Sequence, residues 1–215
     1  MITINDVPLQ NNHTFPGGEV RVQLPKDIVE ISHIIKYKLP ECDIKPRFHI
    51  KAKIKNSDEL IALIHTIEII NVYYGIGHIE LTLNYLPYAR QDRICNPGEI
   101  NGLEWIMKLL DNMGVVKLNI LDMHNPAAIC TGDYKMIIIN IHVSDILLKN
   151  VPLIGNYNFI VAPDAGSAKK IEHIVERANN IFIKNKSHGE LNDMMKAFYH
   201  IEPIFFEKIR DQQTG

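Results

Sequence analysis

Two arginines, a glutamine and an aspartate stand together in one short polar segment. The segment reads Pro87-Tyr88-Ala89-Arg90-Gln91-Asp92-Arg93 and follows a run of β-forming residues. Guanidinium groups bind phosphate through paired hydrogen bonds, and an amide side chain can read the edge of an adenine ring. The segment therefore indicates a nucleotide phosphate site. The alternative is an exposed loop whose arginines pair with Asp92 and Glu99.

Two further candidate residues also follow strand-like runs. His124 ends the run Leu121-Asp122-Met123-His124, and Asp164 stands in Pro163-Asp164-Ala165-Gly166-Ser167-Ala168. One imidazole and one carboxylate suffice for Mg²⁺ when waters and phosphate oxygens complete its coordination shell. An isolated histidine usually binds nothing, however, and an aspartate in this place can be the N-cap of a helix. The residues alone leave both interpretations open.

Strand-like and helix-like segments alternate along the chain and must position these residues. The predicted strands are Val20–Leu24, Phe48–Ile54, His78–Leu86, Val115–Leu121, Met136–Ile141 and Asn158–Ala162. Helices are expected from an N-cap at Ser57, from Asn101 to a closing Gly114 with Trp105 in the core, from Ser144 to Leu148, and from Pro163 to about Ala178. This alternation predicts an α/β fold, in which ligands bind at the carboxyl ends of parallel strands.

Composition excludes several classes of protein. Among 215 residues, 46% are hydrophobic and 22% charged, which is typical of a globular protein. With 23 basic and 25 acidic residues, no excess charge favours nucleic acid or an anionic membrane. Cys42, Cys95 and Cys130 are widely spaced and suggest neither disulfides nor a zinc site. No leader or membrane-length apolar run is visible, so we expect a cytoplasmic protein.

Four motifs, in order and approximate spacing, resemble the ribose-phosphate pyrophosphokinase family. They are Phe15-Pro16-Gly17-Gly18-Glu19, the segment from Pro87 to Arg93, Asp122-Met123-His124, and Pro163-Asp164-Ala165-Gly166-Ser167-Ala168-Lys169-Lys170. The resemblance implies two phosphoribosyltransferase-type parallel-sheet domains. Residues 1–145 would form the N-terminal domain with the ATP-binding loop, and residues 146–215 would form part of the C-terminal domain, joined near Pro152 and Gly155.

The resemblance also implies roles for individual residues. The enzyme is a transferase of nucleotide biosynthesis, a kinase that moves pyrophosphate from Mg-ATP to ribose 5-phosphate and releases AMP. The implied ATP-binding residues are Phe15, Gly17, Glu19, Arg90, Gln91, Asp92, Arg93 and His124, with the loop of Glu19 reaching the adenine from a partner subunit of a homodimer or higher homo-oligomer. His124 and Asp164 would hold Mg²⁺, while Lys208 and Arg210 would close over the phosphates during catalysis.

Two features depart from the family pattern. The usual charged stretch after Arg93 is replaced by Ile94-Cys95-Asn96-Pro97-Gly98-Glu99-Ile100. The family's loop for the 5-phosphate of ribose would lie beyond the Lys208 segment, so we expect the second domain to be incomplete in this chain. These departures leave a second interpretation open, in which the chain is a non-catalytic regulatory or ATP-binding subunit associated with a synthetase.

Overall fold

A computed structural model describes most of the chain, namely residues 1–9, 13–30, 46–130, 132–150, 159–162, 167–184 and 202–205. The chain divides into two compact units, Met1–Ile141 and His142–Gly215. The sequence placed this division after residue 145, and in the structure it falls between Ile141 and His142. No described helix has both the length and the apolar character that crossing a membrane requires.

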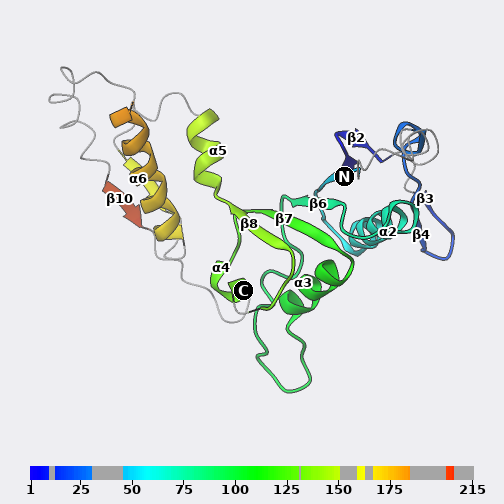
Figure 1. The fold of residues 1–215 in the computed structure, drawn as a ribbon. Coiled ribbons are helices and arrows are strands. Elements are labelled where there is room, and N and C mark those ends of the chain that lie inside the picture. The colour runs from blue at the N-terminus through cyan, green and yellow to red at the C-terminus, as the bar shows by residue number, and fades with distance from the viewer. Residues whose placement is uncertain are drawn as a thin grey trace. The chain divides into compact units, whose positions relative to one another are not determined.

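The first unit is built on a six-stranded sheet with the strand order β2-β1-β5-β6-β7-β8 (Figure 1). Its strands are β1 (Ile2–Ile4), β2 (Val7–Pro8), β5 (Phe48–Ala52), β6 (Ile79–Leu83), β7 (Val115–Leu121) and β8 (Ile137–Ile141). The strands from β5 to β8 are parallel, whereas β1 pairs antiparallel with both of its neighbours. The predicted α/β class with a mostly parallel sheet is therefore confirmed.

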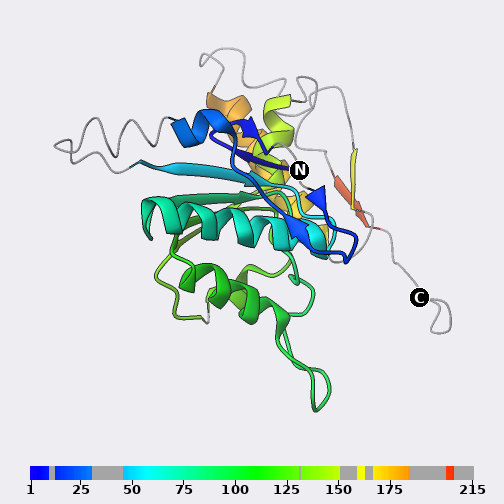
Figure 2. The same ribbon diagram turned by 90° about the vertical axis from the view of Figure 1, so that its right-hand side faces the viewer.

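Two helices cover one face of this sheet. Helix α2 (Ser57–Tyr74) connects β5 to β6, and α3 (Gly102–Asn112) connects β6 to β7. Figure 2 shows both helices along the same side of the strands, as crossovers of one hand require. The core between them contains side chains that are fully buried, including Ile50, Leu63, Ile67, Leu81, Ile106, Leu110 and Leu118. Burial of this apolar surface is what fixes the strand ends in place.

Local hydrogen bonds begin and end these helices. The side chain of Asn56 accepts a hydrogen bond from the backbone N–H of Glu59 at 2.9 Å, so the N-cap of α2 is Asn56 and not the predicted Ser57. Asn101 accepts the corresponding bond from Glu104 at 3.0 Å, as expected. Gly114 follows α3 with a φ of 77°, a conformation that glycine adopts without strain, which confirms the predicted end of that helix.

A small antiparallel hairpin precedes the main sheet. Strands β3 (His13–Thr14) and β4 (Val20–Arg21) pair with each other, and residues 15–19 form the turn between them. The predicted strand extended to Leu24, but residues 22–25 have no strand pairing and residues 26–30 are helical. The prediction was wrong there because alternation over so few residues does not show where pairing stops.

The second unit contains α5 (Val143–Asn150), β9 (Phe159–Ala162), α6 (Ala168–Lys184) and β10 (Glu202–Phe205). Strands β9 and β10 are parallel neighbours. Helices α5 and α6 are joined by a hydrogen bond between Ser144 Oγ and His173 Nδ1 at 3.0 Å and by an ion pair between Asp145 and Arg177. Helix α6 continues to Lys184, past the predicted end at Ala178.

Candidate functional site

The segment that contains Arg90 forms a compact loop at the carboxyl end of β6. Pro87 is buried beneath it, and Tyr88 adopts a φ of 60°. The backbone N–H of Gln91 donates to the carbonyl of Tyr88 at 2.8 Å, which closes the turn around Arg90. The side chains of Arg90, Gln91 and Arg93 are exposed. The loop therefore presents two guanidinium groups and one amide to solvent, as the sequence predicted.

Helix α3 supports this loop from below. The N–H of Leu103 donates to the carbonyl of Gln91 at 3.1 Å. At Gly102, an added Cβ would collide with the side-chain oxygen of Gln91 and would lie 3.2 Å from Tyr88 Cβ. The Tyr88 ring also packs edge-on against Trp105, with ring centroids 5.5 Å apart. Trp105 remains 42% exposed, so its predicted place in the core is wrong.

Asp92 points inward from the same loop. Its side chain is only 7% exposed, whereas that of Arg93 is 75% exposed. The carboxylate accepts hydrogen bonds from Asn125 Nδ2 at 2.8 Å and from Arg93 Nε at 3.2 Å. The bond from Asn125 and then the Arg93 guanidinium hold the pKa of Asp92 below its ordinary value. Glu99, by contrast, pairs with no arginine among the described residues and instead accepts three hydrogen bonds from Cys95 and Asn96.

His124 lies in the turn that follows β7. The turn is anchored on β8, because the N–H of Asp122 donates to the carbonyl of Ile141 at 2.8 Å and that of Met123 donates to Asn140 Oδ1 at 3.0 Å. Asp122 has a φ of 51°, which reverses the chain sharply after the strand. Met123 is buried, and the imidazole of His124 is exposed. Helix α4 (Pro126–Cys130) begins directly after this turn.

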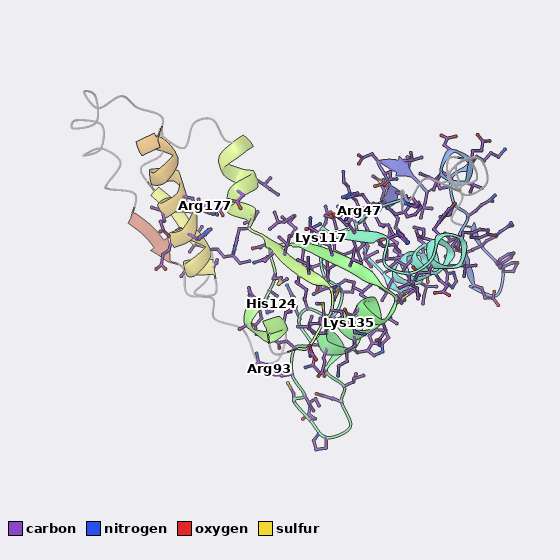
Figure 3. All side chains as sticks on the ribbon, in the orientation of Figure 1. Arg47, Arg93, Lys117, His124, Lys135 and Arg177 are labelled. Atoms are coloured by element: carbon purple, nitrogen blue, oxygen red, sulfur yellow. The ribbon has the colours of Figure 1, made fainter. Side chains whose placement is uncertain are left out.

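The arginine loop and the histidine turn are neighbours. They follow the adjacent parallel strands β6 and β7, and the bond from Asn125 to Asp92 joins them directly. Figure 3 labels Arg93 and His124 in the same region of the first unit. Within the described chain, neither Arg90 nor His124 forms an ion pair with a carboxylate. Two guanidinium groups and an imidazole are thus gathered at one edge of the sheet and face solvent.

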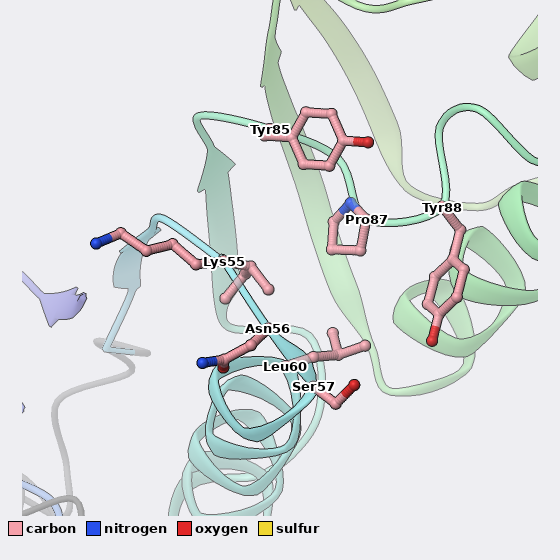
Figure 4. A pocket seen from close by; sticks show the side chains of 8 residues that line it. Lys55, Asn56, Ser57, Leu60, Tyr85, Pro87 and Tyr88 are labelled. Carbon is pink, nitrogen blue, oxygen red and sulfur yellow. The ribbon is translucent and has the colours of Figure 1, made fainter. Parts of the chain in front are cut away.

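A cavity of about 250 Å³ adjoins this loop (Figure 4). Tyr85, Pro87 and Tyr88 form one side of it, and the other side is the start of α2 with the residues that precede it, including Lys55 and Ser57. The cavity lies at the carboxyl ends of β5 and β6, where open α/β sheets bind ligands. The sequence did not predict this cavity, because the cavity forms between segments that are far apart in the chain.

The hairpin tip from Phe15 to Glu19 is also ordered by local bonds. Phe15 N–H donates to the carbonyl of Glu19 at 2.9 Å, and Gly18, with a φ of 92°, donates to the carbonyl of Phe15 at 2.8 Å. The Glu19 carboxylate lies over Gly17, where a Cβ would be 2.6 Å from one of its oxygens. Phe15, Gly17 and Glu19 are all exposed. Their predicted reach to the adenine of a second subunit remains a prediction.

The predicted metal ligands are only partly within the described chain. Asp164 and the catalytic candidates Lys208 and Arg210 lie outside the described residues. In the part that the structure describes, no group of three or more histidine, cysteine or acidic side chains is arranged to hold a metal ion. His124 alone is a weak site for Mg²⁺, which prefers oxygen ligands and fills its shell with waters and phosphate oxygens. A magnesium site here would depend on Asp164 and a bound nucleotide.

Comparison with known proteins shows which proteins this chain resembles. No family model matches the chain. Three curated proteins do, each named ribose-phosphate pyrophosphokinase. That of Aeropyrum pernix is 32% identical over 101 residues (46% of this chain and 32% of the relative), that of Saccharolobus solfataricus 25% over 170 residues (78% and 52%), and that of Pyrococcus abyssi 28% over 102 residues (47% and 35%). Over the matched regions the chain is similar in sequence to ribose-phosphate pyrophosphokinases.

A solved structure is similar to this chain in fold. The crystal structure of phosphoribosylpyrophosphate synthetase from Mycobacterium smegmatis matches 95% of this chain and 57% of its own with a TM-score of 0.59, at 16% sequence identity. This likeness concerns the fold. The matched region spans about half the length, or less, of the ribose-phosphate pyrophosphokinases compared by sequence.

A second group of cations in the first unit has a different arrangement. Glu80 on β6 is 10% exposed and lies between His49 of β5 and Lys117 of β7, its partners in the sheet register. Arg47 Nη1 is 3.4 Å from one of its carboxylate oxygens, and Lys117 Nζ and His49 Nε2 are 3.4 and 3.6 Å from the other. This group, which we call the Glu80 cluster, was not predicted, because a lone acidic residue in a strand gives no signal of its neighbours.

Proposed function

We propose that this chain provides the Mg-ATP-binding part of a ribose-phosphate pyrophosphokinase. The observation that carries the proposal is the junction of the arginine loop and the histidine turn at the carboxyl ends of β6 and β7. An ATP triphosphate carries its charge on oxygens that guanidinium groups bind well, and an imidazole beside them can hold a metal ion bound to the phosphates. Exposed cations on two adjacent loops suit such an extended anion better than a single basic residue does.

The roles follow from the geometry and from the family. Arg90 and Arg93 hold phosphate oxygens, and the amide of Gln91 contacts the adenine. Asp92 orients Arg93 within the ATP site. Phe15, Gly17 and Glu19 of a second copy reach the adenine in a homodimer of this cytoplasmic enzyme. His124 and Asp164 hold Mg²⁺, which neutralises phosphate charge when it is bound.

The proposed reaction is a single displacement. The C1 hydroxyl oxygen of ribose 5-phosphate bonds to the β-phosphorus of ATP, and the bond from that phosphorus to the oxygen shared with the α-phosphate breaks. AMP leaves with the bonding electrons, and the hydroxyl proton passes to solvent. Lys208 and Arg210 contribute by neutralising charge on the transferred group, a role that matters most in the transition state.

The test measures AMP release from ATP and Mg²⁺ with ribose 5-phosphate, with ribose as the control acceptor. We expect AMP only with ribose 5-phosphate. In Lys208→Ala, turnover should fall about a hundredfold or more while Mg-ATP binding, followed by calorimetry, changes little. Mg-ATP binding without AMP release would refute the enzyme and favour the regulatory or ATP-binding subunit. Absence of both would refute both functions.

A further inference from the structure

In the described chain, a side-chain hydrogen bond of Asn125 crosses from the histidine turn to the arginine loop. Its Nδ2 donates to Asp92 Oδ2 at 2.8 Å, across 33 positions of sequence. The side chain of Asp92 is largely shielded from solvent at this contact, with 7% of it exposed. A buried carboxylate needs hydrogen-bond donors, so the bond from Asn125 helps to fix the direction in which the carboxylate points.

Each end of this bond is attached to the rigid sheet and helix framework. The carbonyl of Asp92 accepts a bond from Asn101 Nδ2 at 3.3 Å, and Asn101 is the N-cap of α3. On the other side, Met123 is bonded to Asn140 of β8. The Asp92–Asn125 bond therefore connects two anchored segments. Arg90 and His124 are each within two residues of one end of it.

We propose that Asn125 is a positioning residue that sets the spacing between Arg90 and His124. This inference rests on the proposed function for its consequence in ATP binding. Cations on separate loops bind one triphosphate well only if their separation is fixed before the ligand arrives, because ordering them at binding costs entropy. Asn125 does this through Asp92 and does not itself contact the ligand.

The experiment compares Asn125→Ala with Asn119→Ala. Asn119 offers a matched control, because its Nδ2 donates to Thr82 Oγ1 at 3.2 Å and so also joins β6 to β7, but inside the sheet. We expect Asn125→Ala to weaken Mg-ATP binding about tenfold in calorimetry, which corresponds to ~1.4 kcal/mol. Asn119→Ala should change that affinity less than about twofold, since it leaves the loop and the turn joined.

A reciprocal exchange separates positioning from general stability. Asn125→Asp alone places two carboxylates against each other and should weaken binding at least as much as Asn125→Ala. Adding Asp92→Asn restores an amide opposite a carboxylate, and we expect it to recover most of the lost affinity. If Asn125 served only the stability of the fold, Asn125→Asp would lower the melting temperature, but ATP affinity would not fall in this variant and return when Asp92→Asn is added.

Hydrogen exchange gives a readout that does not depend on ATP. In Asn125→Ala, amides of residues 87–93 and 122–125 should exchange faster together, whereas in Asn119→Ala they should not. If the wild-type protein binds ATP and Asn125→Ala binds it equally well, the inference is wrong and the proposed function stands. If the wild type binds no ATP, the proposed function fails, and unchanged exchange in Asn125→Ala would refute the link between the two segments as well.

Discussion

The first unit gathers cations around a carboxylate in two places, and the two differ in what the carboxylate binds. In the Glu80 cluster, Arg47, His49 and Lys117 all point to the same buried carboxylate. At the arginine loop, only 7% of the Asp92 side chain is exposed, and its shortest hydrogen bond comes from the neutral amide of Asn125.

This difference decides which cations are available to a ligand. The cations of the Glu80 cluster have a counter-charge within the protein, so a phosphate would have to compete with Glu80 for them. Arg90 and His124 form no ion pair within the described residues, and a phosphate meets no such competitor there. The neutral amide of Asn125 makes the shorter hydrogen bond to Asp92, and of the two arginines in the loop only Arg93 pairs with this carboxylate, so Arg90 stays available to a ligand.

The largest expected effect is the loss of Mg-ATP affinity when Arg90 is replaced. Arg90→Ala should lower the affinity for Mg-ATP by about 10- to 100-fold, because a charge-assisted hydrogen bond contributes roughly 1.5–3 kcal/mol. Arg47→Ala removes another exposed guanidinium, that of the Glu80 cluster, and should change the affinity less than about twofold. Calorimetric titration of both variants measures this, and similar losses in the two would mean that charge alone, and not position, governs binding.

Much of the framework behind this comparison was predictable from the sequence. The strands β5 to β8 and the helices between them follow from apolar periodicity, and a Pro-containing polar run after a strand indicates a loop at its carboxyl end. Because β6 and β7 are adjacent and parallel, Arg90 and His124 had to emerge at the same edge. The spacing of Leu103, Ile106, Met107 and Leu110 also marked the buried side of α3.

The failures have physical causes. Strands β1 and β2 are too short to show an alternation of apolar and polar residues. They also pair antiparallel at one edge of the sheet, which an alternation of strands and helices does not predict. Trp105 was expected in the core, but it does not lie on the buried face of α3. It is 42% exposed and packs against Tyr88. The Asn125–Asp92 bond depends on side-chain directions in two turns, which no local pattern specifies.

A smaller effect is expected at the Glu80 cluster, and it concerns stability. Glu80→Ala leaves Arg47, Lys117 and the imidazole of His49 without their carboxylate partner, but Arg47 and His49 are 76% and 53% exposed and can be hydrated instead. The free energy of unfolding should fall by about 1–2 kcal/mol, between the values for exposed and buried ion pairs. Urea denaturation gives this quantity. Mg-ATP affinity should stay unchanged, and a parallel loss of affinity would show that the two regions are coupled.

The smallest expected effect is on the pH dependence of the stability that Asp92 contributes. The hydrogen bond from Asn125, followed by Arg93, lowers the pKa of Asp92 from its ordinary value of 3.8. The unfolded state therefore takes up this proton first as the pH falls, so the stability that Asp92 contributes is full above about pH 5 and is lost as the pH falls through its folded pKa.

The pKa values of other carboxylates, including Asp6, Glu59 and Glu99, are also lowered. The measurement must therefore separate the contribution of Asp92 to the pH dependence of stability from theirs. The difference in unfolding free energy between the wild type and Asp92→Asn, taken from urea denaturation, should be constant near neutral pH and should shrink below about pH 4. In the Asn125→Ala background the same difference should depend less on pH, because the main cause of the lowered pKa is gone. An undiminished pH dependence in that background would assign the shift to Arg93, and the amide would then no longer distinguish this carboxylate from Glu80.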